Sequence, residues 1–333
     1  MEKKNIEWIL LTGGAGFIGS HTAEALLSKG YGVCVADSFN NFYSPSVKRD
    51  NIKCIEASAK GAGALKVYET DIRNLKGIDE IFASHNFSAV IHLAAYAGVR
   101  PSIENAPLYT DVNINGTLNI LECMKKYGVS RLVFASSSSV YGNNKKVPFS
   151  ETDFVDNPIS PYAATKKAGE LLCHTYSHLY GINSACLRFF TVYGPRQRPD
   201  LAIYKFTKLI TENKEIPFFG DGSACRDYTF ITDTVDGIVK ALRWTGKVQG
   251  RFEVFNLGES RTISLSEMVS EIEKSTGKKA ALNKLPMQPG DVYKTFADIS
   301  KAKEILGYNP TFSFAEGIKI FTNWYTEKFQ PAQ

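Results

Sequence analysis

A glycine-rich turn between an apolar run and a helical pattern constrains this chain most. Residues 9–11 are apolar, Gly13, Gly16 and Gly19 follow at intervals of three, and apolar residues continue at helical spacing. This order predicts a strand, a phosphate-binding loop and a helix, because the amino end of a helix presents free N–H groups to an anion. We expect Gly13 to permit a tight turn, Gly16 to let a pyrophosphate approach, and Gly19 to allow close helix packing.

A second apolar run, residues 31–36, ends in Asp37. In a dinucleotide-binding unit, a carboxylate at this position accepts hydrogen bonds from the adenosine ribose hydroxyls and repels a 2′-phosphate. The sequence therefore favours NAD over NADP. A loop carboxylate that only caps a turn is the alternative explanation of Asp37.

Tyr162 and Lys166 lie four positions apart in a helical pattern and follow a serine run at 136–139. Because positions i and i+4 share a helix face, we expect the ammonium to lie beside the phenol and to lower its pKa below the usual value of about 10. Such a pair indicates a base for a sugar-like hydroxyl proton, with a serine hydroxyl orienting the same oxygen. An exposed helical pair is the structural alternative.

Apolar runs alternate with amphipathic stretches along the first half of the chain, which predicts an α/β fold with a Rossmann-type, doubly wound parallel sheet. Beyond Pro195 the pattern is less regular, and residues 265–276 and 299–306 have the character of surface helices. We expect an NAD-binding domain and a smaller α/β domain that binds the substrate. Their predicted extents are 1–188 plus about 227–258 for the first, and 189–226 plus 259–333 for the second.

Composition excludes several classes of function. The net charge of +5 is modest, and the chain carries 34 acidic residues among its 333. This balance does not favour nucleic-acid binding. Six cysteines without Cys-x-x-Cys spacing indicate reduced thiols of a cytoplasmic protein. No apolar stretch approaches the roughly 20 residues of a membrane span. The five histidines lack the spacing of a metal site, so we expect no metal.

Several segments occur in the order typical of the extended short-chain dehydrogenase/reductase family, which the chain resembles over nearly its whole length. They are residues 12–19, Asp71-Ile72, 92–95, Asn113, 136–142, 162–166 and 188–196. Within this family, residues 38–43, 97–100, 162–170 and 188–200 are most similar to the UDP-glucuronate 4-epimerases. The resemblance implies tightly bound NAD, a UDP-sugar substrate and a homodimer whose helices near 113–126 and 162–180 pair in a four-helix bundle.

The resemblance also implies a mechanism. Tyr162 would take the proton of the sugar 4-hydroxyl while C4 gives a hydride to NAD, and the resulting ketone would rotate and receive the hydride on its other face. Lys166 would also bind the nicotinamide ribose, and Ser137 would hydrogen-bond the 4-oxygen. The implied cofactor contacts are Gly13, Gly16, Phe17, Ile18, Gly19, Asp37, Asp71, Ile72, Leu93, Ala94, Ala95, Asn113 and Lys166.

The two positions after Ser137 distinguish sister reactions of the family. Sugar-nucleotide 4,6-dehydratases carry Asp-Glu there, and UDP-glucuronate decarboxylases usually carry Glu at the second position. This chain has Ser138 and Ser139, which are not acids or bases near neutral pH. We expect their hydroxyls to hold a C6 carboxylate instead.

Other substrate contacts follow from the same resemblance. The expected contacts are Thr191 and Arg198 at the sugar carboxylate, Arg226 at the diphosphate, Asp291 at the uridine ribose, Phe218 and Phe219 flanking uracil, and Arg100 near the substrate. A solvated turn for Arg198 and core packing for the two phenylalanines are the structural alternatives. Two other functions stay open: 4-epimerisation of a neutral UDP-hexose such as UDP-glucose or UDP-N-acetylglucosamine, and non-catalytic sensing of NAD or nucleotide sugars.

Overall fold

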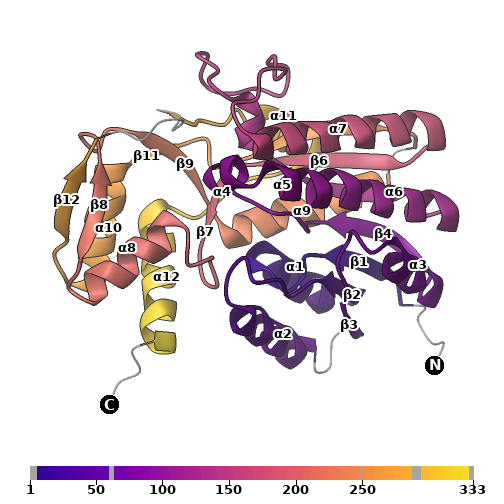
Figure 1. The fold of residues 1–333 in the computed structure, drawn as a ribbon, viewed down its shortest axis with the longest axis horizontal. Helices are drawn as coiled ribbons and strands as arrows, with labels where there is room; N and C mark the ends of the chain where they lie inside the picture. The colour runs from indigo at the N-terminus through magenta and orange to yellow at the C-terminus, as the bar shows by residue number, and fades with distance from the viewer. Residues whose placement is uncertain (1–5, 60–63, 248, 287–293, 330–333) are drawn as a thin grey trace.

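A parallel seven-stranded sheet forms the centre of the molecule (Figure 1). The computed structural model describes residues 6–59, 64–247, 249–286 and 294–329. The strand order is β10-β6-β5-β4-β1-β2-β3, so the order reverses at β1. In chain order the strands are β1 (Trp8–Thr12), β2 (Gly32–Asp37), β3 (Leu65–Glu69), β4 (Phe87–His92), β5 (Arg131–Ser137), β6 (Asn183–Phe189) and β10 (Phe252–Leu257). This confirms the predicted doubly wound sheet.

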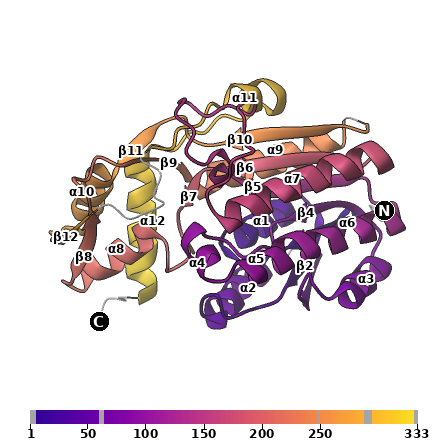
Figure 2. The same cartoon turned by 45° about the horizontal axis from the view of Figure 1, so that its top comes forward.

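Helices cover both faces of this sheet, because its strands alternate their side chains between two hydrophobic cores. On β1, Ile9 and Leu11 belong to one core and Leu10 belongs to the other. The first face carries α1 (Phe17–Ser28), α2 (Pro45–Ala59) and α9 (Ile231–Thr245). The second carries α3 (Leu75–Ser84), α6 (Gly116–Tyr127) and α7 (Pro161–Tyr180). Figures 1 and 2 both show α6 and α7 side by side.

Two small sheets lie to the left of the large sheet in Figure 1. One contains β7 (Thr191–Tyr193), β9 (Cys225–Phe230) and β11 (Thr262–Ser264), and the other contains β8 (Glu215–Phe219) and β12 (Ala281–Leu285). They pack with α8 (Ala202–Thr211), α10 (Leu265–Thr276) and α12 (Phe314–Phe329), while α11 (Ser300–Leu306) lies beside β10. The surface helices predicted at 265–276 and 299–306 are confirmed as α10 and α11.

The return of the chain to the large sheet differs from the prediction. We expected residues 227–258 to belong there, but β9 pairs with β7 and β11 in the three-stranded sheet. The buried Asp227 carboxylate holds the segment that leads into β11 beside β9, because it accepts hydrogen bonds from the backbone N–H groups of Glu259 and Ser260, and it accepts another from Ala297. Only α9 and β10 return, with α9 on one face and β10 at the edge beside β6.

The remaining helices are short and lie near the carboxyl ends of β4 and β5. They are α4 (Val99–Glu104), α5 (Ala106–Thr110), the π-helix η1 (Asp111–Asn115) and the 3-10 helix η2 (Ser138–Tyr141). A π-helix is rare and often occurs at a functional site. Across the described ranges, none of the helices combines the length and the apolar character needed to cross a membrane.

Candidate active site

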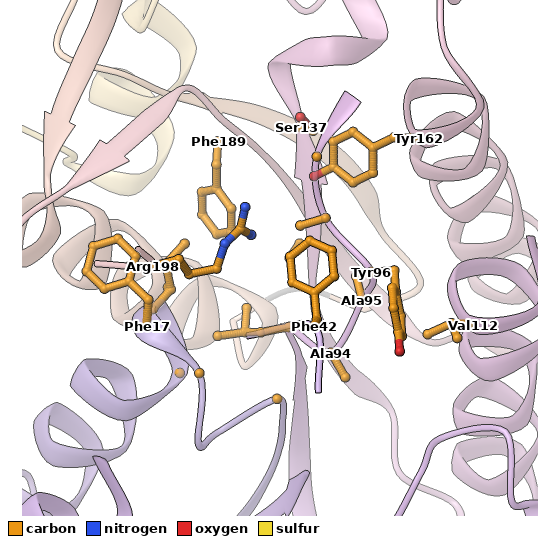
Figure 3. Close-up of a pocket in the computed structure, with 18 of the residues that line it drawn as sticks. Phe17, Phe42, Ala94, Ala95, Tyr96, Val112, Ser137, Tyr162, Phe189 and Arg198 are labelled. Atoms are coloured by element: carbon orange, nitrogen blue, oxygen red, sulfur yellow. The ribbon is translucent and has the colours of Figure 1, made fainter. Parts of the chain in front are cut away.

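A cavity of about 370 Å³ lies at the carboxyl ends of the central strands, where the strand order reverses. A switch point of this kind is where open α/β sheets bind ligands. Most of the predicted site residues meet here, and Figure 3 draws 18 of the residues that form the wall and labels ten of them. The predicted residues that line the cavity are Gly13, Gly16, Phe17, Ile18, Gly19, Asp37, Asp71, Ile72, Leu93, Ala94, Ala95, Ser137, Ser138, Ser139, Tyr162, Lys166, Thr191 and Arg198.

The glycine loop leaves both space and donors for an anion. Gly13 has a φ of +70°, and a side chain there would come within 2.8 Å of the backbone nitrogen of Ala94. A side chain at Gly19 would overlap the carbonyl oxygen of Gly13. Helix α1 begins at Phe17 with Gly16 as its N-cap, so no cap side chain accepts hydrogen bonds from the first turn. These N–H groups face the cavity and fit the pyrophosphate of a dinucleotide.

Asp37 is buried at the end of β2, and both of its carboxylate oxygens contact the backbone. One oxygen accepts a hydrogen bond from the Phe39 N–H at 2.9 Å and the other from the Ala15 N–H at 3.1 Å. Burial raises the pKa of Asp37, while the Phe39 bond and the charge of Lys48 oppose this rise. An ionised carboxylate has about four acceptor positions, so two remain for ribose hydroxyls. Asp37 therefore caps a turn and lines the cavity at the same time.

Tyr162 lies in the first turn of α7, where the local sequence fixes the start of the helix. The Ser160 hydroxyl accepts a hydrogen bond from the Ala163 N–H at 3.2 Å, and Pro161 occupies the first helical position. The Tyr162 phenol points at Ser137, which ends β5 (Figure 3). Burial raises the pKa of Tyr162, and a hydrogen bond with Ser137 and the charge of Arg198 act against that rise.

The prediction that Lys166 lowers the pKa of Tyr162 below its usual value is wrong. The Lys166 ammonium donates a hydrogen bond to the Ala135 carbonyl oxygen at 2.7 Å and lies 6.0 Å from the centroid of the Tyr162 ring. Burial lowers the pKa of Lys166 to about 8. Burial also outweighs the charges near the phenol, so the pKa of Tyr162 is raised rather than lowered. The cation that opposes this rise is Arg198.

The serine run forms a compact group of hydroxyls opposite Tyr162. The Ser137 hydroxyl donates to the Ser139 hydroxyl at 3.1 Å and accepts from the Ser139 N–H at 3.1 Å. Ser138 and Ser139 are half-buried and line the cavity. Thr191, at the start of β7, is also half-buried and lines it. Four small hydroxyl side chains therefore lie in this part of the cavity, and none of them is an acid or base near neutral pH.

Arg198 enters the cavity between Phe42 and Phe189 (Figure 3). Its side chain is 17% exposed, which contradicts the solvated-turn alternative. Its Nε and one terminal nitrogen donate hydrogen bonds to the two carboxylate oxygens of Asp200, at 3.0 and 2.8 Å. Burial alone would lower the pKa of Arg198, but the bonds and charge of Asp200 raise it. Arg198 therefore stays charged inside the cavity.

Two predicted contacts serve the scaffold instead of lining the cavity. Asn113, in η1, is buried and bonds through its side chain to the backbone N–H and carbonyl of Tyr96 and to the Thr165 hydroxyl. It therefore ties the segment after β4 to α7. Phe218 packs in the hydrophobic core because β8 directs alternate side chains, Ile216 and Phe218, to the same buried face. The structure therefore shows core packing for Phe218, and its contact with uracil stays a prediction.

Three further predicted substrate contacts, Arg100, Phe219 and Arg226, do not line the cavity. Arg100, on α4, lies over the ring of Phe219, with 6.0 Å to the centroid, so these two candidates meet each other. Arg226, on β9, is half-buried and donates a hydrogen bond to the Cys225 carbonyl oxygen at 2.9 Å. Asp291 lies outside the described residues.

Sequence reasoning missed an aromatic wall of the cavity, formed by Phe42, Tyr43, Tyr96, Phe189 and Phe190. Phe42 and Tyr96 make an edge-to-face contact with their ring centroids 5.5 Å apart. The only signal in the sequence was the density of aromatic residues in 39–43. That signal is weak, because aromatic residues are more often core than site.

His92 illustrates why the histidines form no metal site. Its ring is buried on β4 and bonds to the hydroxyls of Thr12 at 2.6 Å and Thr117 at 3.0 Å. Burial and the charge of Lys166 lower the pKa of His92 to about 3, so the ring is neutral. Among the residues that the structure describes, no group of His, Cys, Asp and Glu side chains could hold a metal ion.

Comparison with known proteins gives consistent results. Residues 10–321 match the family model described as GDP-mannose 4,6 dehydratase. The UDP-glucuronate 4-epimerase of Thermodesulfobacterium geofontis is 44% identical over 324 residues, which cover 97% of each chain. The structure of Bacillus cereus UDP-glucuronic acid 4-epimerase with UDP-glucuronic acid and NAD has a TM-score of 0.88 and 37% identity, covering 97% of this chain and 100% of that one. The Thermotoga maritima UDP-glucose 4-epimerase with UDP-glucose has a TM-score of 0.88 and 34% identity at the same coverage.

Proposed function

The chain belongs to the family of the GDP-mannose 4,6 dehydratase model, within the extended short-chain dehydrogenases/reductases, and on this premise we propose that it is an NAD-dependent UDP-glucuronate 4-epimerase. It would interconvert UDP-glucuronate and UDP-galacturonate by transient oxidation at C4. The observation that carries the proposal is one cavity that holds Tyr162, Ser137 and the charged Arg198. The names of the relatives from Thermodesulfobacterium geofontis and Bacillus cereus support the same activity.

NAD fits the nucleotide end of the cavity. The uncapped first turn of α1 would hold the pyrophosphate, Asp37 the adenosine ribose, and Lys166 the nicotinamide ribose. When bound, the cofactor supplies an acceptor that takes a hydride from C4 and returns it. The other proposed contacts are the lining residues Phe17, Ile18, Asp71, Ile72, Leu93, Ala94 and Ala95.

Tyr162 would act as the base that takes the proton of the 4-hydroxyl and later returns it to the 4-oxygen. The phenol is buried, which keeps water from competing for this proton. The Ser137 hydroxyl would turn from Ser139 toward the 4-oxygen and hydrogen-bond it in both states of the sugar. A positioned base of this kind contributes about 10²–10⁴-fold to the rate.

We call the part of the cavity around Ser137, Tyr162 and Arg198 the sugar end. The carboxylate of the sugar distinguishes the uronate from a neutral hexose. Arg198 would pair with it, and the hydroxyls of Ser138, Ser139 and Thr191 would donate hydrogen bonds that hold it in place. Neither serine can act as the acid or base that dehydration across C5 and C6 requires. A neutral UDP-hexose, the substrate class of the Thermotoga maritima relative, would leave the charge of Arg198 without a role.

The assembly and the organisation of the chain are further parts of the proposal. Exposed leucines on α6 and α7, namely Leu118, Leu171 and Leu179, support a homodimer formed through these helices. The six free thiols support a cytoplasmic location. We assign NAD binding to the part with the large sheet, residues 1–188 with α9 and β10, and UDP-sugar binding to the part with the two small sheets.

Incubation of the purified protein with UDP-glucuronate, without added NAD, tests the proposal. Anion-exchange chromatography and proton NMR would resolve the products. UDP-galacturonate without released CO₂ is the expected product. A UDP-pentose would overturn the assigned role of Ser138 and Ser139. In parallel incubations with UDP-glucose and UDP-N-acetylglucosamine, conversion of one of these without conversion of UDP-glucuronate would overturn the choice of the uronate.

A further inference from the structure

Among the residues that the structure describes, Asp200 holds the guanidinium of Arg198 by one edge. Asp200 takes one hydrogen from Nε and one from a terminal nitrogen, in a two-point contact at 3.0 and 2.8 Å. A guanidinium has five N–H donors, and Asp200 uses two of them. The second terminal nitrogen keeps both of its hydrogens for another acceptor, and the terminal nitrogen that bonds to Asp200 keeps one. The free edge therefore faces away from Asp200. Planar two-point pairs of this kind fix direction as well as charge.

An aromatic ring supports the face of the same guanidinium. The centre of the Arg198 group lies 5.3 Å from the centroid of the Phe42 ring, within the range of a cation–π contact. Phe42 meets Tyr96 edge to face, with centroids 5.5 Å apart, and Tyr96 meets Tyr109 in the same way at 5.8 Å. Tyr109 in turn contacts Tyr162, with centroids 6.3 Å apart. A row of rings therefore runs from the proposed base to the guanidinium.

The backbone on both sides of this contact is anchored. The Phe42 N–H donates to the Asn40 side chain at 3.1 Å, and the Lys48 ammonium donates to the same Asn40 oxygen at 2.9 Å. On the other side, Arg196 has a φ of 65° and donates to Glu24 of α1 at 2.9 Å. Both anchors tie the contact to the helices of the nucleotide end, so Arg198 rests on a scaffold that is fixed from outside the sugar site.

We propose that Asp200 and Phe42 are positioning residues that direct the free edge of Arg198 into the sugar end of the cavity, and that preference for an anionic UDP-hexose depends on them. This inference deepens the proposed function and rests on it. Asp200 holds the Nε edge and Phe42 supports the face, so the free edge keeps one direction. Without either, the guanidinium would keep its charge and lose the geometry of a two-point contact with the sugar carboxylate.

The test measures the dissociation constants of UDP-glucuronate and UDP-glucose by calorimetry, on the full chain with saturating NAD. Asp200→Asn and Phe42→Leu should each weaken the binding of UDP-glucuronate about tenfold, because the two-point contact of Arg198 with the sugar carboxylate loses its fixed direction while the charge of Arg198 remains. UDP-glucose should bind as it does to the unchanged protein. Phe42→Tyr keeps the ring and should keep the preference.

Asp221→Asn is the matched control for the change of charge. Asp221 lies in an exposed turn, where its carboxylate accepts a hydrogen bond from the Ser223 N–H at 2.9 Å. This variant should leave both dissociation constants unchanged. A merely structural role of Asp200 or Phe42 would instead weaken both ligands together and lower the melting temperature.

The outcomes separate the two proposals. If the unchanged protein epimerises UDP-glucuronate but Asp200→Asn and Phe42→Leu keep its preference, the positioning role is wrong and the proposed function stands. If the unchanged protein prefers UDP-glucose, the proposed function itself is wrong. Should Phe42→Leu fail to fold, the ratio of the two dissociation constants measured for Asp200→Asn decides whether the positioning role is right, because that substitution changes no packing volume.

Discussion

The nucleotide end and the sugar end of the cavity are built from different kinds of group. At the nucleotide end the backbone does most of the work: a glycine loop, the uncapped start of α1 and the ends of β1, β2 and β4. At the sugar end the groups are side chains from distant segments, among them Phe42, Ser137, Tyr162 and Arg198. In the proposed function, the first end recognises a dinucleotide mainly through backbone groups and Asp37, whereas the second would select the sugar and the reaction through side chains.

This difference predicts how each end fails. Substitution at the nucleotide end disturbs the backbone, so stability and cofactor content should change together. Substitution at the sugar end removes one function of a side chain and should leave the fold and the cofactor intact. The following variants test this contrast, from the largest expected effect to the smallest.

Tyr162→Phe should lower turnover of UDP-glucuronate by about 10²–10⁴-fold, the usual contribution of a positioned base. The melting temperature and the content of bound NAD should not change, because the hydroxyl bonds to Ser137, whose own hydroxyl keeps its bond to Ser139. Tyr204→Phe is the control, since Tyr204 and Lys208 have the same spacing on α8 but do not line the cavity. Equal activity of the two variants would contradict the role of Tyr162.

Arg198→Met should weaken the binding of UDP-glucuronate by about 10–100-fold, since a hydrogen bond to a charged group contributes about 1.5–3 kcal/mol. The affinity for UDP-glucose should stay close to that of the unchanged protein. Titration calorimetry with both ligands measures the two values. An equal loss for both ligands would mean that Arg198 supports the fold of the sugar end rather than binding the carboxylate.

Gly13→Ala should cost about 1–2 kcal/mol of stability, because an L-residue is strained at a φ of +70°, and should also reduce the NAD that copurifies. Gly30→Ala is the matched control. Gly30 has a φ of +82° but open space around it, so Gly30→Ala should lose less stability than Gly13→Ala and should retain its NAD. Thermal unfolding and the absorbance of the released cofactor measure both effects.

Lys166→Met should change how the free energy of unfolding depends on pH. Burial lowers the pKa of Lys166 to about 8 in the folded chain, against 10.5 for the ordinary group. Between these values the unfolded chain binds a proton that the folded chain has lost, so the contribution of Lys166 to stability rises with pH above about 8. The variant should lack this rise. Denaturant unfolding at pH 7.5 and 9.5 measures the free energy of unfolding at both pH values. An equal change of this free energy with pH in both proteins would refute the effect of burial on Lys166.

Phe218→Leu should have the smallest effect, a loss of about 1 kcal/mol of stability from looser packing in the core, with unchanged affinity for UDP. Phe219→Leu should leave the stability unchanged and weaken the binding of UDP, because Phe219 is half-buried on the other face of β8 and contacts Arg100. Reversal of these two results would restore Phe218 as the uracil contact.

The contrast also explains what the sequence could predict. The glycine loop, the ends of β1 and β2, and the seven-stranded sheet follow from local patterns, because periodicity and backbone geometry are written in neighbouring residues. Tyr162 and Ser137 were found for the same reason, since each sits at the end of a regular element. Residues tied by long-range pairing were harder: β9 joined the three-stranded sheet, against prediction, because the Asp227 carboxylate binds segments after β10.

Electrostatics was the least predictable property. The i, i+4 spacing correctly placed Tyr162 and Lys166 on one helix face, but the pKa of the phenol depends on how deeply both groups are buried. The role of Phe42 had no local signal, because its contact with Arg198 joins residues more than 150 positions apart in the chain. Burial and contacts of this length emerge only from the assembled fold.

UDP-glucuronate that carries deuterium at C4 gives the most direct test of the central claim, transient oxidation at C4 with a retained cofactor. The labelled sugar is incubated with the purified protein in ordinary water, and the product is examined by NMR. The account predicts UDP-galacturonate with its deuterium still at C4, because the hydride that leaves that carbon returns to it. UDP-galacturonate with protium at C4 would contradict the account, since the hydrogen would then have come from the solvent.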